Sequence, residues 1–391
     1  MQLVAYGAQD IYLTGNPQIT FFKVVYRRHT NFSMESIQQT WNGTDGTGAD
    51  GRCTATISRN GDLVHKMYLQ IASTGNTAEH NPGMWGITDV TLEIGGQQID
   101  KHYGHYMEVW AELTEVNPYF VCGGVAPQAA ADSRGAATAF QMLSAAGGYA
   151  NGAAPPTTVF VPLYFWFCKN PGLALPLIAL QYHEVKVILN HVYNSAFGTV
   201  TSQNLWVDYV YLDTDERRRF AQQSHEYLIE QVQHLSTSAA KSMDLNFNHP
   251  VKELIWTGAH TNTTGSQARA AVTDANWKIK LNGHDRMAER PRYYFTRQQV
   301  RDYHSGPGGV AGGVGSLLDT AVKTNKSDDS IAVYSFALKP EEHQPSGTCN
   351  FSRIDNAQLV QDGTAASHEV YAVNYNVLRI MSGMGGLAYS N

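Results

Sequence analysis

Two histidines three residues apart, His102 and His105, have the spacing of paired metal ligands. On a helix, this spacing places both imidazoles on one side, where they could bind one zinc ion. Tyr103 and Tyr106 stand beside them, and no obvious third ligand accompanies the pair. We therefore interpret His102 and His105 as histidines of an aromatic cluster at an interface, and we predict no metal site.

A second candidate, His225-Glu226, matches the beginning of the zinc-protease motif HExxH. That motif places its second histidine four residues after the first, on the same face of a helix. The next histidine in this sequence is His234, nine positions after His225. Two imidazoles at that spacing do not share a helix face, so the sequence does not indicate a metalloprotease.

Paired carboxylates, such as Glu341-Glu342 and Asp328-Asp329, are the groups that a glycosidase uses. Both pairs stand among Pro, Lys and Ser residues, in sequence typical of solvated turns. The sequence also contains no GxxxxGK[ST] phosphate loop and no GxSxG nucleophile elbow. We predict no catalytic residue and no cofactor, and we expect that the protein is not an enzyme.

Several asparagines begin the N-x-[ST] sequons that accept glycans in secreted proteins. They are Asn31, Asn42, Asn262, Asn325 and Asn350. Asn262 and Asn325 fall in expected loops, which makes them the preferred candidates for glycosylation. The first ten residues, MQLVAYGAQD, lack the basic region and apolar core of a secretory signal, so unmodified asparagines are the default expectation.

The chain has 391 residues, more than one hydrophobic core usually serves, so we expect two domains. Charged residues make up only 16% of it, against about 25% in an ordinary soluble domain. Such a thinly charged surface favours a protein that other subunits largely cover. The net charge is −6 and no basic run exceeds Arg217–Arg219, so we expect no direct binding to nucleic acid.

The four cysteines, Cys53, Cys122, Cys168 and Cys349, have the spacing of neither a metal site nor a disulfide framework. We interpret them as free, buried thiols in a reducing compartment. The apolar run from Val159 to Cys168 is interrupted by a proline and is far shorter than the roughly 18 residues that cross a membrane. The sequence therefore predicts no transmembrane segment.

The elements that must position these residues are mainly β-strands, because apolar and polar residues alternate along most of the clear segments. Residues 90–94 and 277–281 are examples, and turn dipeptides at Asn60-Gly61, Gly95-Gly96 and Asn282-Gly283 favour hairpins. Convincing helical periodicity is confined to residues 106–116, whose apolar side chains fall on one face. Short strands without regular helical crossovers predict antiparallel sandwiches.

The sequence also repeats itself, because four blocks of the first half recur in the same order in the second half. Pairing Asp62 with Pro250 and Gly96 with Gly283 gives offsets of 188 and 187 residues, and the offset falls to 165 at the last block. The matched segments are 61–72 with 249–259, 90–98 with 277–285, 161–168 with 332–339, and 205–212 with 370–378. A duplicated sandwich follows, with the charged segment 213–223 as its linker.

Much of the chain resembles the double jelly-roll major capsid proteins of the nucleocytoplasmic large DNA viruses, most closely those of chlorella viruses and other phycodnaviruses. Examples are QLVAYGAQDIYLTGNPQITFFKVVYRRHTNF, LEIGGQQIDKHY and PSGTCNFSRIDNA. The similar segments are residues 2–32, 58–63, 92–103, 171–187, 206–214, 225–231, 245–250, 345–357 and 374–389. Together they span nearly the whole chain.

The resemblance implies an all-β chain of two tandem eight-stranded antiparallel jelly-roll sandwiches, with short helices in the loops. The implied division is a base segment at 1–24, sandwiches at 25–212 and 224–391, and the linker at 213–223. Three copies would form a pseudo-hexagonal capsomer in the outer capsid shell of the virion. Neighbouring capsomers, minor capsid proteins and an internal membrane below the shell would be its surroundings, and assembly would take place in the host cytoplasm.

Relatives often carry glycans on outward loops at asparagines outside the usual sequon, and Asn76 is partly similar to such a site. The loops at 257–277 and 303–330 look short for the family, and the acceptor context of the relatives is not clearly reproduced. A minor capsid paralogue and a lectin-like attachment protein remain alternatives. An enzyme on the same fold is a third, and it would need carboxylates that converge in a cleft.

Overall fold

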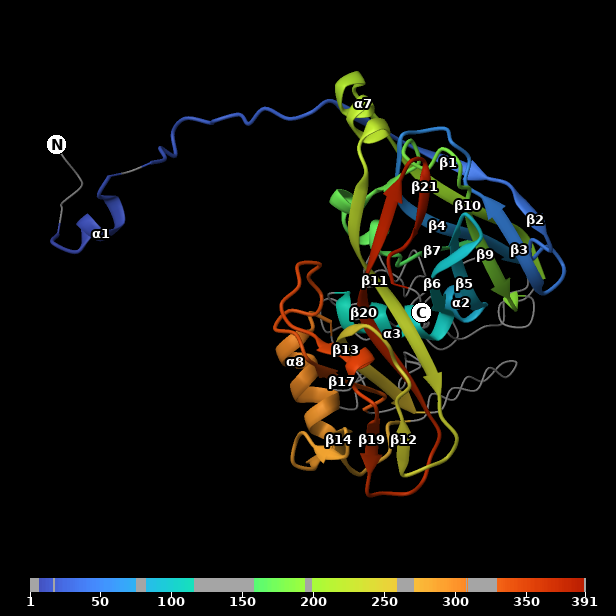
Figure 1. Ribbon diagram of the computed structural model, residues 1–391, viewed down its shortest axis with the longest axis vertical. Helices are drawn as coiled ribbons and strands as arrows, with labels where there is room; N and C mark the ends of the chain where they lie inside the picture. Colours follow the sequence, from blue (N-terminus) through green and yellow to red (C-terminus); the bar gives the residue numbers. More distant parts are fainter. Residues whose placement is uncertain are drawn as a thin grey trace, which may run out of the picture.

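The computed structural model describes residues 7–16, 18–74, 82–115, 158–193, 199–258, 271–306, 308 and 329–389. These residues form an all-β molecule of two sandwiches, which lie one above the other along the long axis of Figure 1. All strand pairs are antiparallel in the described part, as the turn signals predict.

The first sandwich packs a sheet of order β1-β10-β4-β7, with the short β8 beside β4, on a sheet of order β2-β3-β9-β5-β6. The strands are β1 (Phe32–Gln39), β2 (Trp41–Gly43), β3 (Gly51–Thr56), β4 (Leu63–Thr74), β5 (Ile87–Ile94), β6 (Gln97–Tyr103), β7 (Thr158–Pro162), β8 (Leu175–Pro176), β9 (Val185–His191) and β10 (Thr199–Leu212).

The second sandwich packs a sheet of order β11-β20-β13-β17 on a sheet of order β12-β19-β14-β15, with β16, β18 and β21 as additions. The strands are β11 (His225–Ser236), β12 (Ser242–Asp244), β13 (Pro250–Gly258), β14 (Asn276–Leu281), β15 (His284–Asp285), β16 (Arg290–Pro291), β17 (Ile331–Ser335), β18 (Cys349–Asn350), β19 (Ala357–Gln361), β20 (His368–Met381) and β21 (Met384–Leu387).

Short helices occupy the connections. They are α1 (Asp10–Thr14), α2 (Pro82–Trp85), α3 (Gly104–Thr114), α5 (Trp166–Lys169), α7 (Thr214–Gln222), α8 (Gln299–Tyr303), the π-helix η3 (Tyr294–Gln298) and the 3-10 helices η2 (Pro171–Leu173) and η4 (Phe351–Arg353). None of the described helices has the length and apolar character needed to span a membrane.

The strand orders confirm the fold predicted from the internal repeat. In the described residues the first sandwich has ten strands and the second has eleven, where eight each were predicted, because short strands such as β8 and β18 add to the sheets. The strands β1, β10, β4 and β7 correspond in order to β11, β20, β13 and β17. Leu69 pairs with Leu205 and Val161, and Trp256 pairs with Val370 and Ala332. The two sandwiches therefore share their register as well as their strand order.

One sequence pairing is wrong by a single residue. Leu63 pairs with β8 as Pro250 pairs with β18, so Leu63 is the counterpart of Pro250 and the offset is 187 residues. Asp62, which we aligned with Pro250, precedes β4. The error matters because a shift of one residue exchanges the two faces of a strand.

Two of the three predicted hairpin turns are confirmed. Gly95-Gly96 joins β5 to β6 and Asn282-Gly283 joins β14 to β15, each with two residues at positive φ. Asn60-Gly61 is not a hairpin, because β3 and β4 belong to different sheets. A Cβ on Gly61 would lie 2.7 Å from the Cβ of Tyr209, so this glycine allows a close approach as the chain crosses between sheets.

The predicted alternation of buried and more exposed residues holds in β14, where Trp277, Ile279 and Leu281 are buried. In contrast, β13 and most of β20 are buried on both faces. One face of their sheet packs on the second sandwich core, and the other is covered by α3 from the first sandwich. The sequence pattern of a half-buried strand therefore fails where the sandwiches meet.

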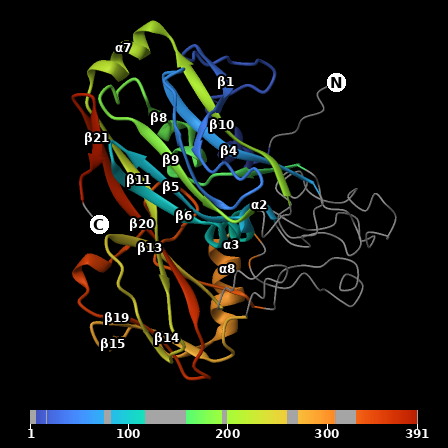
Figure 2. The ribbon, with the colours of Figure 1, turned by 90° about the vertical axis from the view of Figure 1, so that its right-hand side faces the viewer.

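The predicted helix is confirmed as α3, at Gly104–Thr114. The predicted apolar face, Tyr106, Val109, Trp110 and Leu113, does not enter the first core. It packs on β13, β17 and β20 of the second sandwich, whereas other α3 side chains enter the first core. Figure 2 shows α3 between the two sandwiches.

The segment predicted as a linker, 213–223, contains the helix α7, which the sequence analysis did not predict. Asp213 caps it by accepting a hydrogen bond from the backbone N–H of Thr214, and no residue of α7 is buried. The chain also crosses back further on, because Ile229, Leu378 and Ile380 join the first core. The β20–β21 hairpin accordingly extends alongside the first sandwich (Figure 1).

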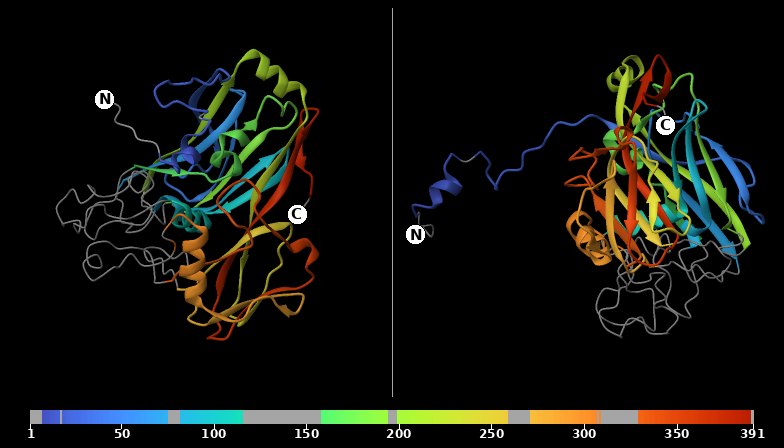
Figure 3. Two further views of the ribbon diagram at one scale, coloured as in Figure 1. Left: turned by 90° about the vertical axis from the view of Figure 1, so that its left-hand side faces the viewer. Right: turned by 60° about the horizontal axis from the view of Figure 1, so that its bottom comes forward.

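The described part of the N-terminal segment extends away from both sandwiches (Figures 1 and 3). Its large apolar side chains are exposed, among them Ile19, Phe21, Phe22, Val24, Val25 and Tyr26. The segment joins the body at Phe32, the first residue of β1.

Candidate functional site: the seam between the two sandwiches

Several buried charged residues contact one another in the seam, by which we mean the interface of α3, α5 and β6 with β11, β13 and β20. The carboxylate of Glu230 on β11 receives two ammonium groups there. Lys252 on β13 is 2.6 Å from it and has no exposed side-chain surface, and Lys169 on α5 is 3.1 Å away. Burial opposes ionisation of Glu230, but the two lysines outweigh it and hold its pKa at about 2.

Trp110 of α3 packs beside this ion triad. The ammonium of Lys169 lies 4.2 Å from its ring centre and that of Lys252 lies 6.0 Å away, so both cations face the π-system. Lys169 comes from the first sandwich, whereas Glu230 and Lys252 come from the second. The triad therefore ties the two sandwiches together.

A second cluster in the seam centres on His304, which follows α8. Its Nε2 lies 3.0 Å from Glu253 of β13 and its Nδ1 lies 3.1 Å from Glu341. Burial alone would lower the pKa of His304, but the two carboxylates outweigh it and raise the pKa to about 9. Ser305 joins the cluster to α3, since its hydroxyl contacts Glu341 and donates to the carbonyl of Thr114.

The predicted histidine pair also lies in the seam, as the interpretation of an interfacial aromatic cluster expects. His102 is buried, 2.8 Å from Asp100, and its ring stacks on Phe165. His105 contacts the hydroxyl of Tyr371 on β20 at 2.8 Å. Within the described residues, no three His, Cys, Asp or Glu side chains are placed to hold a metal ion.

The other chemical candidates have structural partners. Glu342 pairs with Lys339, and Glu226 pairs with Arg379. Asp329 accepts two hydrogen bonds from Arg297 and one from Thr296, which lower its pKa although burial acts in the opposite direction. Asp328 lies outside the described residues. His225 contacts the carbonyl of Phe220. His225 and His234 both lie on the strand β11, so they do not form the helical pair of a zinc protease.

Three of the four cysteines are described, and each carries a free thiol. Cys53 is buried, whereas Cys168 and Cys349 are half-buried. Burial raises the pKa of Cys53 and of Cys168 to about 12, and it also raises that of Cys349. All three are therefore weak nucleophiles at neutral pH.

The preferred glycosylation candidates, Asn76, Asn262 and Asn325, lie outside the described residues. Of the remaining sequons, Asn31 and Asn42 are exposed. Asn350 is also exposed, and its side chain accepts a hydrogen bond from the backbone N–H of Ser352.

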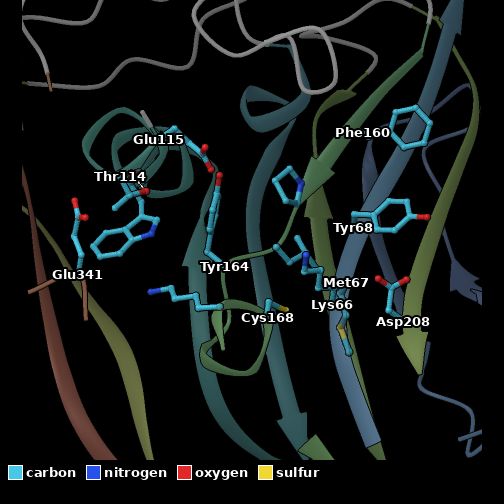
Figure 4. A pocket seen from close by; sticks show the side chains of 14 residues that line it. Lys66, Met67, Tyr68, Thr114, Glu115, Phe160, Tyr164, Cys168, Asp208 and Glu341 are labelled. Carbon is cyan, nitrogen blue, oxygen red and sulfur yellow. Dashed lines mark hydrogen bonds between the residues drawn. The ribbon is translucent and has the colours of Figure 1, made fainter. Parts of the chain in front are cut away.

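A pocket of about 730 Å³ opens beside the seam (Figure 4). Tyr68 and Phe160, on the outer face of the first sheet, line one side of it. Thr114 and Glu341 line the other side, and Asp208 lies near Tyr68. The pocket is therefore lined by both aromatic rings and charged side chains, residue types that also occur in protein interfaces.

Sequence reasoning found the histidines of the seam but missed its ion triad. Lys252 stands in a strand pattern where alternation places a solvated residue, and Lys169 follows an apolar run. Their burial depends on which surfaces of the two sandwiches meet. One signal was available, because Lys252 and Glu253 interrupt an otherwise largely apolar strand.

Comparison with known proteins agrees with this architecture. The N-terminal sequence profile of major capsid proteins matches residues 20–213, and that of the large eukaryotic DNA virus major capsid proteins matches 216–311 and 320–386. The chain is 51% identical to the major capsid protein of Pyramimonas orientalis virus and 41% identical to that of Paramecium bursaria Chlorella virus 1. Both alignments cover 100% of this chain and 99% of the relative.

Solved structures show the same fold. A chain of the PBCV-1 virus capsid superposes with a TM-score of 0.73 at 35% identity, over 95% of this chain and 100% of that chain. The Faustovirus major capsid protein superposes at 0.64 with 13% identity, over 96% of this chain and 94% of that chain, a likeness of fold alone.

Two jelly rolls of one strand order, fixed to each other by a buried seam, define the class of double jelly-roll viral coat proteins. Within that class, the chain belongs to the major capsid proteins of the large eukaryotic DNA viruses. It is thus a structural protein of a viral capsid, as the sequence resemblance implies.

Proposed function

We propose that three copies of this chain form a pseudo-hexagonal capsomer that tiles the outer shell of a large icosahedral virus. The observation that carries the proposal is the repeated sandwich, because two units of equal strand order in each of three copies supply six similar positions in a ring. The thin charge of the chain supports it, since subunit contacts then rest on apolar and aromatic burial.

The division of the chain at 213–223 belongs to the same proposal. It is supported by the sheet orders, since β1 to β10 pair among themselves and β11 to β21 do likewise in the described residues. The exposed apolar side chains of the N-terminal segment support its role as the base segment, 1–24, which would contact minor capsid proteins above an internal membrane. Assembly in the host cytoplasm completes this part of the proposal.

We also propose that the protein has no enzymatic activity and does not bind the genome directly. The relatives are named as capsid proteins, and the net charge of −6 opposes contact with nucleic acid. Virus-specified glycans at Asn76, Asn262 or Asn325 stay a prediction, which mass spectrometry of the coat protein from virions would test.

The decisive experiment is the solution mass of the purified protein by light scattering after gel filtration. We expect three times the chain mass of 43.1 kDa. A monomer that persists across concentration would contradict the capsomer proposal and favour a lectin-like attachment protein, whose sugar affinity could then be measured on glycan arrays.

A further inference from the structure

The outer face of the β11-β20-β13-β17 sheet, in the second sandwich, is buried by the first sandwich of the same chain. Ile255 of β13, Ile331 of β17 and Tyr371 of β20 lie under α3 and have at most 4% exposed surface. Tyr106 of α3 packs 5.3 Å from Tyr371, measured between ring centres. This face therefore shows what a sandwich of this type places against its neighbour.

The shared register identifies the same face on the first sandwich. Tyr68 is the counterpart of Ile255, Phe160 of Ile331 and Trp206 of Tyr371. These counterparts follow from the strand pairing alone, so the correspondence does not depend on residue type. Tyr68 stacks on Trp206 at 6.5 Å and lies 6.1 Å from Phe160, so the three rings form one aromatic surface.

No element of this chain covers that aromatic surface as α3 covers its counterpart, in the part of the chain that the structure describes. All three rings are only half-buried, and Tyr68 and Phe160 line the open pocket of Figure 4. On the neighbouring edge strand β1, Phe32 and Met34 point to the same side and are 61% and 49% exposed. We call these five residues the open face.

The second sandwich carries a helix that corresponds to α3. His102 pairs with Val90 just before α3, and Arg290 pairs with Trp277 just before η3, which gives an offset of 188 residues. Under this offset Met107 corresponds to Phe295, and each of them packs in the core of its own sandwich. The segment η3–α8 therefore occupies the place of α3.

The partner-facing side of α3 has exposed counterparts on η3–α8. His105, Val109 and Leu113 touch the second sandwich and are buried or half-buried. Their counterparts are Tyr293, Arg297 and Arg301, and all three are exposed. The guanidinium groups of Arg292 and Arg297 lie 5.1 Å and 4.5 Å from the ring centre of Tyr293.

We propose that the open face is covered by the η3–α8 segment of a second copy of this chain. The arrangement would be the one that α3 takes on the β11-β20-β13-β17 sheet within one chain. This inference rests on the capsomer proposal and specifies its contact. Tyr and Arg side chains from one copy would meet Trp and Tyr rings of the next, the residue types that dominate protein interfaces. Since the two contacting surfaces differ, the contact is heterologous, and in the proposed trimer three such contacts close the ring.

The first test places an arginine on the open face. Ser36 is exposed on β1, and the backbone N–H of its counterpart Val232 donates a hydrogen bond to Asp100 of the first sandwich. We expect Ser36→Arg to weaken trimer formation at least tenfold by light scattering across a dilution series. The matched control is Ser33→Arg, on the opposite side of the same strand and also exposed, which should leave the mass unchanged.

The second test cross-links the proposed contact. Tyr103 and His234 lie 4.4 Å apart between ring centres, and their counterparts are Pro291 and Gln38, which are both exposed. We expect a short bismaleimide to link Gln38→Cys of one copy to Pro291→Cys of the next. The doubly substituted protein should give bands of two and three chains on a denaturing gel, whereas wild type and each single variant should not.

The outcomes separate the two proposals. A trimer in which Ser36→Arg has no effect and the cysteine pair does not cross-link would overturn the contact and leave the capsomer standing. A wild-type monomer would overturn both. Circular dichroism of Ser36→Arg guards against a folding defect, because a folded monomer is the result that supports the contact. The cross-link tests the same contact without placing a charge on β1.

Discussion

At the scale of single residues, Lys252 defines the seam, because a lysine with no exposed side chain needs a permanent counter-charge. Glu230 supplies that charge and also holds Lys169 of the other sandwich. The triad therefore adds specificity to the way the sandwiches meet. Loss of the Glu230 carboxylate would leave two cations facing one indole ring.

Replacing Glu230 by glutamine should reduce the free energy of unfolding by about 3–5 kcal/mol, because it leaves Lys252 buried without a counter-charge. Urea unfolding followed by tryptophan fluorescence would measure the change. The control is Glu226→Gln on the same strand, whose exposed pair with Arg379 is worth under about 1 kcal/mol. Equal losses in the two variants would refute the assigned role of the triad.

His304 gives the seam a dependence on pH. Its pKa is raised to about 9 in the folded state, so the stability that it contributes is fully present below pH 6.5 and is lost as the pH rises through 9. We expect the free energy of unfolding to fall by about 2–3 kcal/mol between pH 6.5 and pH 9.

A histidine variant isolates this contribution. His304→Gln should be less stable than wild type at pH 6.5 and should lose less stability on the way to pH 9, as urea unfolding at several pH values would show. His284→Gln, an exposed substitution on β15, should retain the wild-type slope. A wild-type slope in His304→Gln would assign the pH dependence to other groups.

At the scale of elements, α3 is a helix shared by two cores, and it begins at a point where the backbone is crowded. A Cβ on Gly104 would collide with the carbonyl oxygens of Met84 and Ile87. Neither oxygen can move without displacing α2 or β5. The glycine therefore fixes how closely α3 lies on the first sandwich and, through its other face, where the second sandwich is held.

Gly104→Ala should lower stability by about 1–3 kcal/mol or more, since the backbone must shift to admit the methyl group. Differential scanning calorimetry would measure this as a lower unfolding temperature. Gly172→Ala in η2 serves as control, because the nearest contact there is a side-chain oxygen at 3.3 Å. An unchanged unfolding temperature for Gly104→Ala would show that α3 tolerates displacement.

Sequence reasoning reached the elements whose signals are local. Alternation, two Gly-containing turns and the apolar stripe of α3 predicted strands, hairpins and a helix that the structure confirms. It failed where distant surfaces decide the outcome. Lys252 is buried because α3 covers its sheet. Asn60-Gly61 leads from one sheet to the other, and the glycine leaves room for Tyr209. The one-residue error at Asp62 arose because similarity of sequence does not measure register.

At the scale of the whole molecule, the sandwiches exchange structural material in both directions. The first contributes α3 to the second, and the second returns Ile229, Leu378 and Ile380 to the first core. Leu387 adds a hydrogen bond to the side chain of Gln97 on β6. The charged helix α7 connects the two sandwiches along the chain. Their relative position is held by α3 and by the β20–β21 hairpin, which each pack on the other sandwich.

Ile380→Ala should destabilise the first sandwich by about 2–5 kcal/mol, although Ile380 lies in β20. Hydrogen exchange with mass spectrometry would show faster exchange in β5, β6 and β9. Met381→Ala, one residue further on and 50% exposed, should leave exchange in those strands unchanged. Faster exchange confined to the second sandwich would contradict the exchanged-element interpretation.

The contact between β21 and the first sandwich also introduces a delay during synthesis of the chain. Gln97 and Leu387, which donates a hydrogen bond to it, are separated by 290 positions, so at roughly 5–20 residues per second the first sandwich waits on the order of tens of seconds for this contact. Until then, β6 lacks the contact with the β20–β21 hairpin in every nascent chain. A polypeptide that stops before Leu387 therefore keeps a first sandwich whose β6 never receives this contact.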